Sequence, residues 1–307
     1  MLNLILRRFA IAIPTLLILT IITFYLMHSA PGGPFTSDKP LPPQVLANIE
    51  AKYGLNDPLP KQLFNYITGI VTQFDFGPSF KYKDRTVNDI ISQGLPITLI
   101  YGTFAFLFAV IFGVSLGVFA AVNQNSKFDY LAVGFTMIAQ VLPNFVMGPI
   151  LILIFTLWLG WLPGGGWNGG QWQNIVMPVI ALGTSYMASI ARLTRSSMLE
   201  VLRSNFIRTA RAKGIPEKTI IWRHALKPAM LPVISYLAPV FVYMITGSFI
   251  IDMIFSTGGL GYYFINSAYN RDYAVMMGIT LLLGSLTIFF NLVVDVIYGW
   301  IDPQIRY

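Results

Sequence analysis

Long apolar runs separated by short polar segments dominate the sequence. Six stretches without any charged residue cover residues 9–27, 96–122, 130–162, 175–191, 229–251 and 274–294. A membrane-spanning helix needs roughly 20 mainly apolar residues, so these runs have the length of bilayer spans. The pattern predicts an all-α polytopic membrane protein with six transmembrane helices. We place them near residues 9–29, 96–122, 130–160, 174–193, 229–251 and 274–296.

The first run has two interpretations. It follows Arg7 and Arg8, and a basic start before an apolar stretch is also typical of a cleavable signal peptide. However, the run is long for the apolar part of a signal peptide. The sequence after it, His28-Ser29-Ala30-Pro31, is a poor match to a small-x-small cleavage site. A retained membrane anchor is the better interpretation.

The third run is too long for one straight span. Its 33 residues would form a helix of about 50 Å, against a hydrocarbon core of about 30 Å. We therefore expect Pro143 and Pro149 to kink this helix, or part of it to lie along the membrane interface. The alternative is two short spans that turn at Leu142-Pro143-Asn144.

Charge placement favours six spans over seven. Charged residues make up only 11% of the chain, against about 25% in soluble domains. Residues 192–228 hold nine basic and two acidic residues, which equals the whole net charge of +7. Lys and Arg collect in cytoplasmic loops, so this segment and Arg7-Arg8 should both lie inside. Six spans achieve that with both termini in the cytoplasm, whereas a seventh span would export the basic segment.

The segment between the first two spans, residues 30–95, is expected outside the membrane. It carries six basic and six acidic residues. Leu41-Pro42-Pro43-Gln44 followed by Val45–Tyr53 predicts a short helix, which Gly54 ends. We expect a small folded cap. In the second span, Gly102, Gly113 and Gly117 predict close approach to neighbouring helices.

The spans lack the groups that several function classes require. Asp252 and Asp295 are expected at helix ends, and the centres of the six runs carry no charge. Ion-coupled transporters, voltage sensors and intramembrane proteases need ionisable groups at depth, so these classes are disfavoured. The chain has no Cys and only two His residues. We therefore expect no disulfide and no metal site.

No segment matches a nucleotide site. Gly214-Ile215-Pro216-Glu217-Lys218-Thr219 lacks the Gly before Lys that a phosphate-binding loop needs, and Pro216 removes an amide donor. The glycine-rich stretch 163–170 joins the third and fourth spans, and we interpret it as a loop with an aromatic anchor, Trp167. We expect no catalytic or cofactor-binding residue. If transport is powered, the ATPase is another chain.

The basic segment predicts an ordered cytoplasmic knob. Ser204 is a candidate N-cap for a short helix over Asn205–Lys213, and Gly214 suits the left-handed position that ends it. Pro216 suits the first turn of a second helix, expected to end near Leu226, before Pro228. One interpretation is a topology signal or anionic-lipid patch. The other is a docking element for a cytoplasmic protein. Nucleic acid is disfavoured, since apolar Phe206 and Ile207 lie beside the basic residues.

At this segment the chain resembles a known family. Phe206-Ile207-Arg208-Thr209-Ala210-Arg211-Ala212-Lys213-Gly214 is similar to the EAA-type loop of ABC-importer permease subunits, in the form found in the dipeptide/oligopeptide branch. In the general motif Glu-Ala-Ala-x3-Gly, only Ala210 and Gly214 match, and Arg208 and Thr209 replace the first two residues.

The resemblance extends over almost the whole chain. Further similar motifs are Ile13-Pro14-Thr15, Ala30-Pro31-Gly32, Tyr53-Gly54-Leu55-Asn56-Asp57-Pro58, Asp75-Phe76-Gly77, Arg271-Asp272-Tyr273 and Ile301-Asp302-Pro303. One departure is Gly258, where the family usually has Pro. Within the branch, the chain most resembles the first membrane subunit of oligopeptide permeases.

The resemblance implies a fold, partners and a coupling site. It implies the type I ABC importer fold, with residues 1–93 as the first span and outer segment. Residues 94–296 form the core with coupling loop 194–228, and 297–307 a cytoplasmic tail. The implied partners are a second homologous permease, two cytoplasmic ATPase subunits that carry ATP and Mg²⁺, and an extracytoplasmic peptide-binding protein. Residues 206–214 would couple to one of the cytoplasmic ATPases, and the chain itself would lie in the bacterial inner membrane.

The substrate and the residues along the pathway stay open. Uncharged spans suit a peptide of any sequence, but dipeptides and nickel chelates are alternatives within the same branch. A secondary transporter or a non-transport membrane scaffold are alternatives from other classes.

Overall fold

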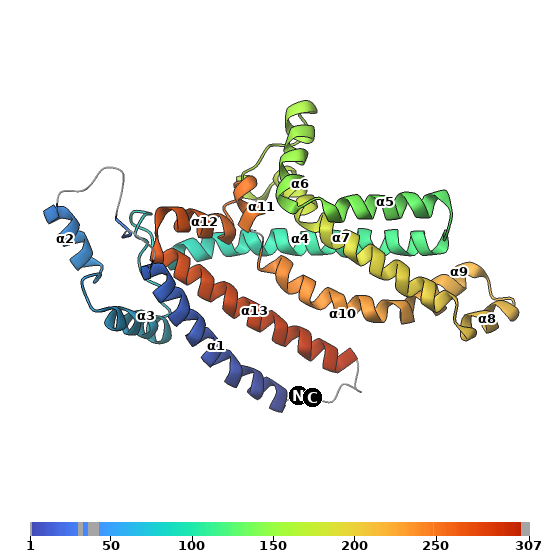
Figure 1. Cartoon of the computed structure of the whole chain (residues 1–307), viewed down its shortest axis with the longest axis horizontal. Coiled ribbons are helices and arrows are strands. Elements are labelled where there is room, and N and C mark those ends of the chain that lie inside the picture. Colours follow the sequence, from blue (N-terminus) through green and yellow to red (C-terminus); the bar gives the residue numbers. More distant parts are fainter. Residues whose placement is uncertain (1, 30–32, 36–42, 248, 302–307) are drawn as a thin grey trace. The chain divides into compact units, whose positions relative to one another are not determined.

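The computed structural model describes residues 2–29, 33–35, 43–247 and 249–301, and these are almost entirely helical (Figure 1). An isolated antiparallel bridge joins Pro78 and Thr86. The predicted all-α class is confirmed. The Ala30-Pro31-Gly32 motif, the Leu41-Pro42 start of the cap and the tail from residue 302 onward lie outside the described residues.

The chain divides into two compact units, residues 1–96 with 258–307, and residues 97–257. The first unit contains α1 (Leu2–Ser29), α2 (Pro43–Lys52), α3 (Leu59–Gln73), the start of α4 (Val87–Val122), α12 (Leu260–Asn270) and α13 (Tyr273–Ile301). The second contains the rest of α4, α5 (Lys127–Val141), α6 (Asn144–Leu151), the π-helix η1 (Ile152–Trp158), the short 3-10 turn η2 (Asn168–Gly170), α7 (Trp172–Leu202), α8 (Asn205–Ala212), α9 (Glu217–Thr219), the π-helix η3 (Ile220–Ala225), α10 (Leu226–Ile245) and α11 (Phe249–Ile254).

Five helical stretches among the described residues are long and apolar enough to cross a membrane. The bent pair formed by Lys127–Val141 and Asn144–Trp158 brings the number to six if it counts as one span. The two parts meet at 104°. Leu142 adopts an extended conformation, as expected for a residue before proline, and Pro143 precedes the first residue of α6. The predicted break at Pro143 is confirmed.

In the first unit, α1 and α13 lie side by side (Figure 1). A Cβ atom at Gly284 of α13 would come within 2.7 Å of the Leu19 side chain of α1, so the absence of a side chain permits this approach. Phe24 and Met27 of α1 pack with Tyr273 and Met277 of α13.

The described part of the segment between α1 and α4 contains two helices, α2 and α3. The predicted helix at Val45–Tyr53 is observed as α2, and Gly54 follows it with φ +67°. Helix α3 was not predicted. Asp272, whose side chain is buried, holds the end of this segment: Ser79 Oγ donates to Asp272 Oδ2 at 2.5 Å, and the Phe80 amide donates to Oδ1 at 3.2 Å.

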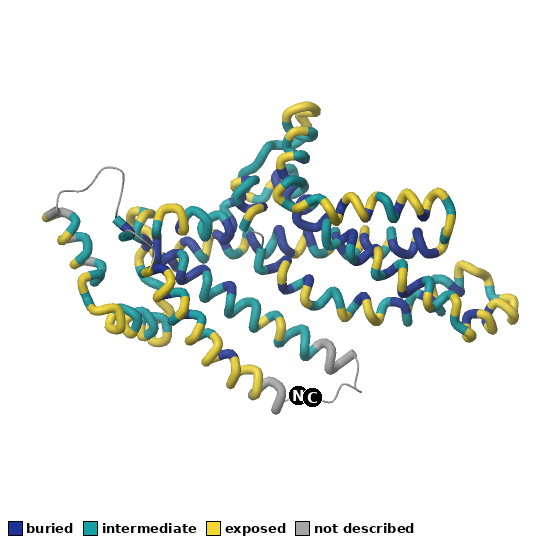
Figure 2. Tube along the Cα trace, in the orientation of Figure 1, coloured by how far each residue is buried: buried dark blue, intermediate teal, exposed yellow. Residues whose placement is uncertain are grey.

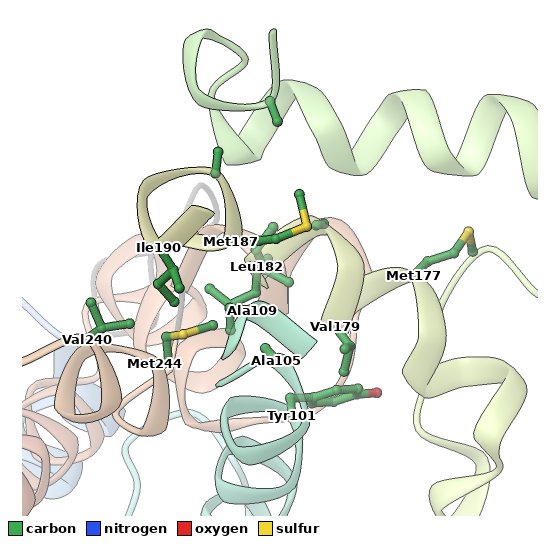
Figure 3. Packing of buried hydrophobic residues seen from close by; sticks show 14 of the residues in the cluster. Tyr101, Ala105, Ala109, Met177, Val179, Leu182, Met187, Ile190, Val240 and Met244 are labelled. Atoms are coloured by element: carbon green, nitrogen blue, oxygen red, sulfur yellow. The ribbon is translucent and has the colours of Figure 1, made fainter. Parts of the chain in front are cut away.

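In the second unit, α7 is the central helix and packs against α5, α6 and α10. Figure 2 shows much of α7 buried, whereas α5 has one exposed side. The largest apolar cluster joins α7 to α4 and α10 (Figure 3). There Met187 and Ile190 of α7 lie near Ala105 and Ala109 of α4 and Met244 of α10.

Glycines set the spacing between these helices, as predicted. A Cβ atom at Gly113 would lie 2.8 Å from the Met187 carbonyl oxygen, and one at Gly117 would lie 2.5 Å from that of Ala191. At Gly102 the corresponding distance to the Met244 carbonyl oxygen is 2.3 Å. Real Cβ atoms do not approach backbone oxygens this closely. The α4 backbone therefore contacts α7 and α10 directly.

Two helices extend beyond the spans that the sequence predicted. α4 begins at Val87 and includes Pro96, where we expected the span to start. α7 continues to Leu202, through the first part of the predicted coupling loop 194–228. The loop therefore starts with a rigid extension of the fourth span.

We expect Gly117→Val to destabilise the protein by about 1–3 kcal/mol, because the new side chain would overlap the α7 backbone. Gly134→Val on α5 is the matched control, since no atom lies within 4 Å of a Cβ atom there. Thermal unfolding of the purified protein in detergent measures both. Equal midpoints for the two variants would contradict this account of helix packing.

Candidate functional site

The predicted knob is present as two helical segments that meet at a corner. Ser204 precedes α8 with an extended backbone, which agrees with its predicted place as N-cap. Its side chain does not cap α8, however, because Ser204 Oγ donates to the Val201 carbonyl oxygen at 2.6 Å. The position was predicted correctly and the hydrogen bond was not.

Gly214 forms the corner with a left-handed backbone, φ +74°, as predicted. Its amide donates to the Arg211 carbonyl oxygen at 2.9 Å, and the Ile215 amide donates to that of Ala210 at 3.3 Å. This pair of bonds is the Schellman motif, which satisfies the last carbonyl groups of a helix. No atom lies within 4 Å of a Cβ atom built at Gly214. The requirement for glycine is therefore conformational and not steric.

The second segment of the knob corrects one prediction. Pro216 precedes α9, as expected, but the helix does not end near Leu226. It continues through η3 into α10 and reaches Ile245. In the π-helical turn the Leu226 amide donates to Ile221, five residues back. The π-helical turn precedes Pro228, and the helix then continues past Pro232 and Pro239 as well.

The nine residues predicted to contact an ATPase divide into two groups. Ile207 and Ala210 are buried within the chain itself, where they pack with Met198 of α7 and Ile220 of η3. The exposed group is Phe206, Arg208, Thr209, Arg211, Ala212, Lys213 and Gly214. The two buried residues hold α8 in place, and only the exposed group is available to another protein.

An ion pair closes the corner. Arg211 on α8 donates to Glu217 on α9 through two nitrogens, with distances of 3.2 and 2.6 Å. This hydrogen bond raises the pKa of the Arg211 guanidinium above its ordinary value. The pair was not predicted, although opposite charges on either side of a Gly-x-Pro corner were a usable signal. The pair links the two arms of the knob.

Two aromatic side chains of the knob face outward. Phe206 is 52% exposed, and Trp222 on η3 is 60% exposed. Trp222 was not among the predicted contact residues. Aromatic residues among cations are typical of surfaces that bind a protein with apolar pockets and acidic groups. This is the chemistry that the knob offers to a partner.

A buried ion pair that sequence reasoning missed lies near the same end of α7. Arg195 of α7 contacts Asp129 of α5 through two hydrogen bonds of 2.7 Å each, and the Asp129 side chain is only 3% exposed. The Asn125 amide also donates to Asp129 at 3.0 Å. A bidentate pair between two helices fixes their relative position.

The two acidic residues expected at helix ends, Asp252 and Asp295, both have partners within the chain. Asp252 lies in α11, is buried, and accepts a hydrogen bond of 2.6 Å from Thr257 Oγ1. Asp295, near the end of α13, forms an ion pair with Arg8 of α1. No cluster of metal-ligating side chains occurs in the part of the chain that the structure describes.

The glycine-rich stretch 163–170 is a loop that packs on the chain itself. The Gly166 amide donates to the Phe255 carbonyl oxygen at 2.7 Å, and Asn174 Nδ2 donates to that of Gly165 at 2.7 Å. Trp167 contacts Tyr101 edge to face, which agrees with its predicted role as an anchor. The Gly166 amide and the Gly165 carbonyl oxygen of this loop are thus used within the chain.

Comparison with known proteins places these features in a family. Residues 113–307 match the family "Binding-protein-dependent transport system inner membrane component". Residues 1–101 match "Binding-prot-dependent transport system membrane comp, N-term".

Similar proteins cover the full chain. The oligopeptide transport system permease protein OppB of Salmonella typhimurium is 56% identical over 307 residues, which is 100% of both chains. OppB of Haemophilus influenzae is 53% identical, also over 100% of both chains. The dipeptide transport system permease protein DppB of Bacillus subtilis is 41% identical over 98% of this chain and 96% of its own.

Solved structures agree on the fold. An inward-facing structure of the MetNI methionine ABC transporter aligns with a TM-score of 0.60 at 18% identity, over 70% of this chain and 97% of that chain. A second crystal form of the same transporter gives a TM-score of 0.59 at 19% identity, over 69% and 96%. The fold is that of type I ABC importer permeases. The chain belongs to the family of inner membrane components of binding-protein-dependent transport systems.

Proposed function

We propose that this chain is one of two permease subunits of an ATP-driven oligopeptide importer in the bacterial inner membrane. The observation that carries the proposal is an ordered knob at the end of α7, on a chain 53–56% identical to oligopeptide permease subunits over its full length. Both termini and the knob would face the cytoplasm. Oligopeptide substrates are favoured over dipeptides because the relatives that are 53–56% identical are oligopeptide permeases, whereas the dipeptide relative is 41% identical.

In this proposal the chain itself catalyses no reaction. A second, homologous permease completes the pathway, and an extracytoplasmic peptide-binding protein delivers the substrate. Two cytoplasmic ATPase subunits hold ATP and Mg²⁺, and the exposed residues of the knob, 206, 208, 209 and 211–214, dock on one of them. ATP binding closes the ATPase pair and moves the knob. A stiff corner passes this movement to α7 and α10.

The proposal is tested by reconstituting the five-subunit complex in vesicles and measuring accumulation of labelled peptides of two to six residues. We expect ATP-dependent uptake that favours the longer peptides. Adding an uncoupler at constant ATP separates this mechanism from secondary transport. Uptake that collapses with the uncoupler, or no uptake at all, would contradict the proposal.

We predict that Gly214→Val uncouples ATP hydrolysis from uptake. The left-handed backbone costs about 1–2 kcal/mol for a residue with a Cβ atom, and a β-branched residue tolerates it least, so the corner loosens. Gly214→Asn is the control, because asparagine accepts this conformation more readily. Peptide uptake and ATP hydrolysis are measured in the same vesicles. Normal uptake by Gly214→Val at wild-type membrane levels would refute this role for the corner.

We predict that substitutions at two adjacent residues of α8 affect different properties, ATPase binding for one and stability for the other. Phe206→Ala removes an exposed side chain, so it should weaken ATPase binding by about tenfold and leave thermal stability unchanged. Ile207→Ala opens a cavity in the buried cluster and should cost about 2–5 kcal/mol of stability. Co-purification of the ATPases and thermal unfolding distinguish the two. A loss of stability in Phe206→Ala would show that this residue acts within the chain.

We predict that Arg211→Glu weakens ATPase association, because two carboxylates then repel each other across the corner. The exchange of both charges, Arg211→Glu with Glu217→Arg, rebuilds the pair and should restore association in part, because the contact that Arg211 itself makes with the ATPase is still missing. An exposed ion pair contributes only about 0.2–1 kcal/mol, so both variants should fold. Association as low in the double variant as in Arg211→Glu would mean that Arg211 acts through its ATPase contact alone and that the pair with Glu217 makes no contribution. Unchanged co-purification of the ATPases with Arg211→Glu would contradict any role of Arg211 in their association.

A further inference from the structure

One side of α7 that its neighbours leave partly uncovered carries a stripe of four polar residues. Ser185, Ser189, Arg192 and Ser196 recur at intervals of three and four residues, so they lie on one side of the helix. Ser185 and Ser189 are half-buried, whereas Arg192 and Ser196 are exposed.

The exposed side of α5, in the same unit, has the opposite character. Its exposed large side chains include Tyr130, Leu131, Phe135, Ile138 and Val141, between 55% and 78% exposed. Such a surface suits the acyl chains of lipids. Polar side chains in membrane proteins face a water-filled path or another protein instead. Ser185 and Ser189 lie within the fourth span, so this side of α7 faces water or another protein there, and Arg192 and Ser196 continue it toward the cytoplasmic end.

This stripe borders an open hollow. Ser189, Arg192, Leu193 and Ser196 of α7 and Tyr236 of α10 line a space of about 530 Å³. Ser189 Oγ donates to the Ser185 carbonyl oxygen at 3.1 Å, and Ser196 Oγ donates to that of Leu193 at 2.9 Å. Each hydroxyl donates its hydrogen to a carbonyl oxygen of α7, so its own oxygen can still accept a hydrogen bond from a ligand N–H group.

Two arginines one turn apart on α7 differ in their partners. Arg195 is held by Asp129 through two hydrogen bonds of 2.7 Å. Among the described residues, Arg192 forms no ion pair and no side-chain hydrogen bond, and its side chain borders the hollow. The Arg192 guanidinium is therefore a fixed positive charge with five donors available in a planar fork.

We propose that this hollow binds the transported peptide by its C-terminal carboxylate, through Arg192, and by its main-chain amides, through Ser189 and Ser196. The inference rests on the proposed peptide import. A guanidinium fork matches a carboxylate with two parallel hydrogen bonds. The terminal carboxylate and the main-chain amides are present in peptides of any sequence, so this site requires no particular side chain. Open solvent beside Arg192 keeps the binding weak enough for release.

The experiment uses the assembled importer in vesicles and two versions of one labelled pentapeptide, a free acid and its C-terminal amide. Arg192→Gln, Arg192→Lys and the control Arg195→Lys are compared with the wild type. The binding protein is the same in every sample, so its own preference cancels in the comparison. ATP hydrolysis stimulated by the loaded binding protein reports whether each complex has assembled.

We expect Arg192→Gln to lower uptake of the free acid about tenfold relative to the amide, the loss expected for one hydrogen bond to a charged group. Arg192→Lys keeps the charge but loses the fork, so it should fall between Arg192→Gln and the wild type. Arg195→Lys should alter both peptides equally. A Ser196→Ala variant should also lower both equally, because main-chain amides are common to the two peptides.

Equal loss of both peptides in Arg192→Gln would overturn the proposal and assign Arg192 a structural role. No loss of either would overturn it as well and would point to a solvent or lipid contact. If the proposed peptide import itself is wrong, the result differs, because the wild-type complex would then import neither peptide. A variant with normal ATP stimulation and an altered acid-to-amide ratio is the outcome that supports the site.

Discussion

Direct contact between the backbones of α4 and α7 is the constraint on which the rest of the second unit depends. Gly113 and Gly117 leave no room for a side chain between their Cα atoms and the carbonyl oxygens of Met187 and Ala191. In lipid, apolar side chains give no special preference for one helix pair over another, whereas this contact does. It fixes α7 at the centre of the unit, where α5, α6 and α10 pack against its other sides.

The position of α7 determines how the knob is attached. α7 continues to Leu202, and Ile207 of α8 then packs back onto Met198 of α7 and Val118 of α4. The knob is thus joined to the same helix pair that the glycines hold together. Nearby, the pair of Asp129 and Arg195 ties α5 to α7. A force on α8 therefore acts on a braced helix, not on a flexible loop.

Local backbone chemistry was predictable from the sequence, but contacts between distant residues were not. Gly214 and Pro143 were identified because a left-handed corner and an extended residue before proline depend on neighbouring residues only. The pair of Asp129 and Arg195 joins residues 66 positions apart, and no local pattern points to it. The burial of Ile207 likewise depends on where α4 and α7 end.

The prediction that the second helix of the knob ends near Leu226 was wrong for a different reason. Pro228 ends a regular α-helix in most contexts, and the sequence pattern was interpreted on that rule. The π-helical turn η3 shifts the hydrogen-bond register just before the proline, and the chain continues as one helical arm to Ile245. Helix-propensity rules apply to the α-helical pattern of hydrogen bonds. They do not predict a π-turn, whose hydrogen bonds span one residue more. The consequence is functional, since the second arm of the knob becomes continuous with a span.

The knob and the polar stripe share one helix, and this links the two proposed sites mechanically. Arg192 and Leu202 lie ten residues apart on the unbroken α7, which is about 15 Å along the helix axis. A helix braced by Gly117 and by the Asp129–Arg195 pair moves as a body over that distance. Displacement of the knob therefore changes the position of the Arg192 guanidinium without any intervening hinge. On this reasoning, closure of the ATPases would move the carboxylate-binding charge directly, and peptide release would follow from the same movement that opens the pathway.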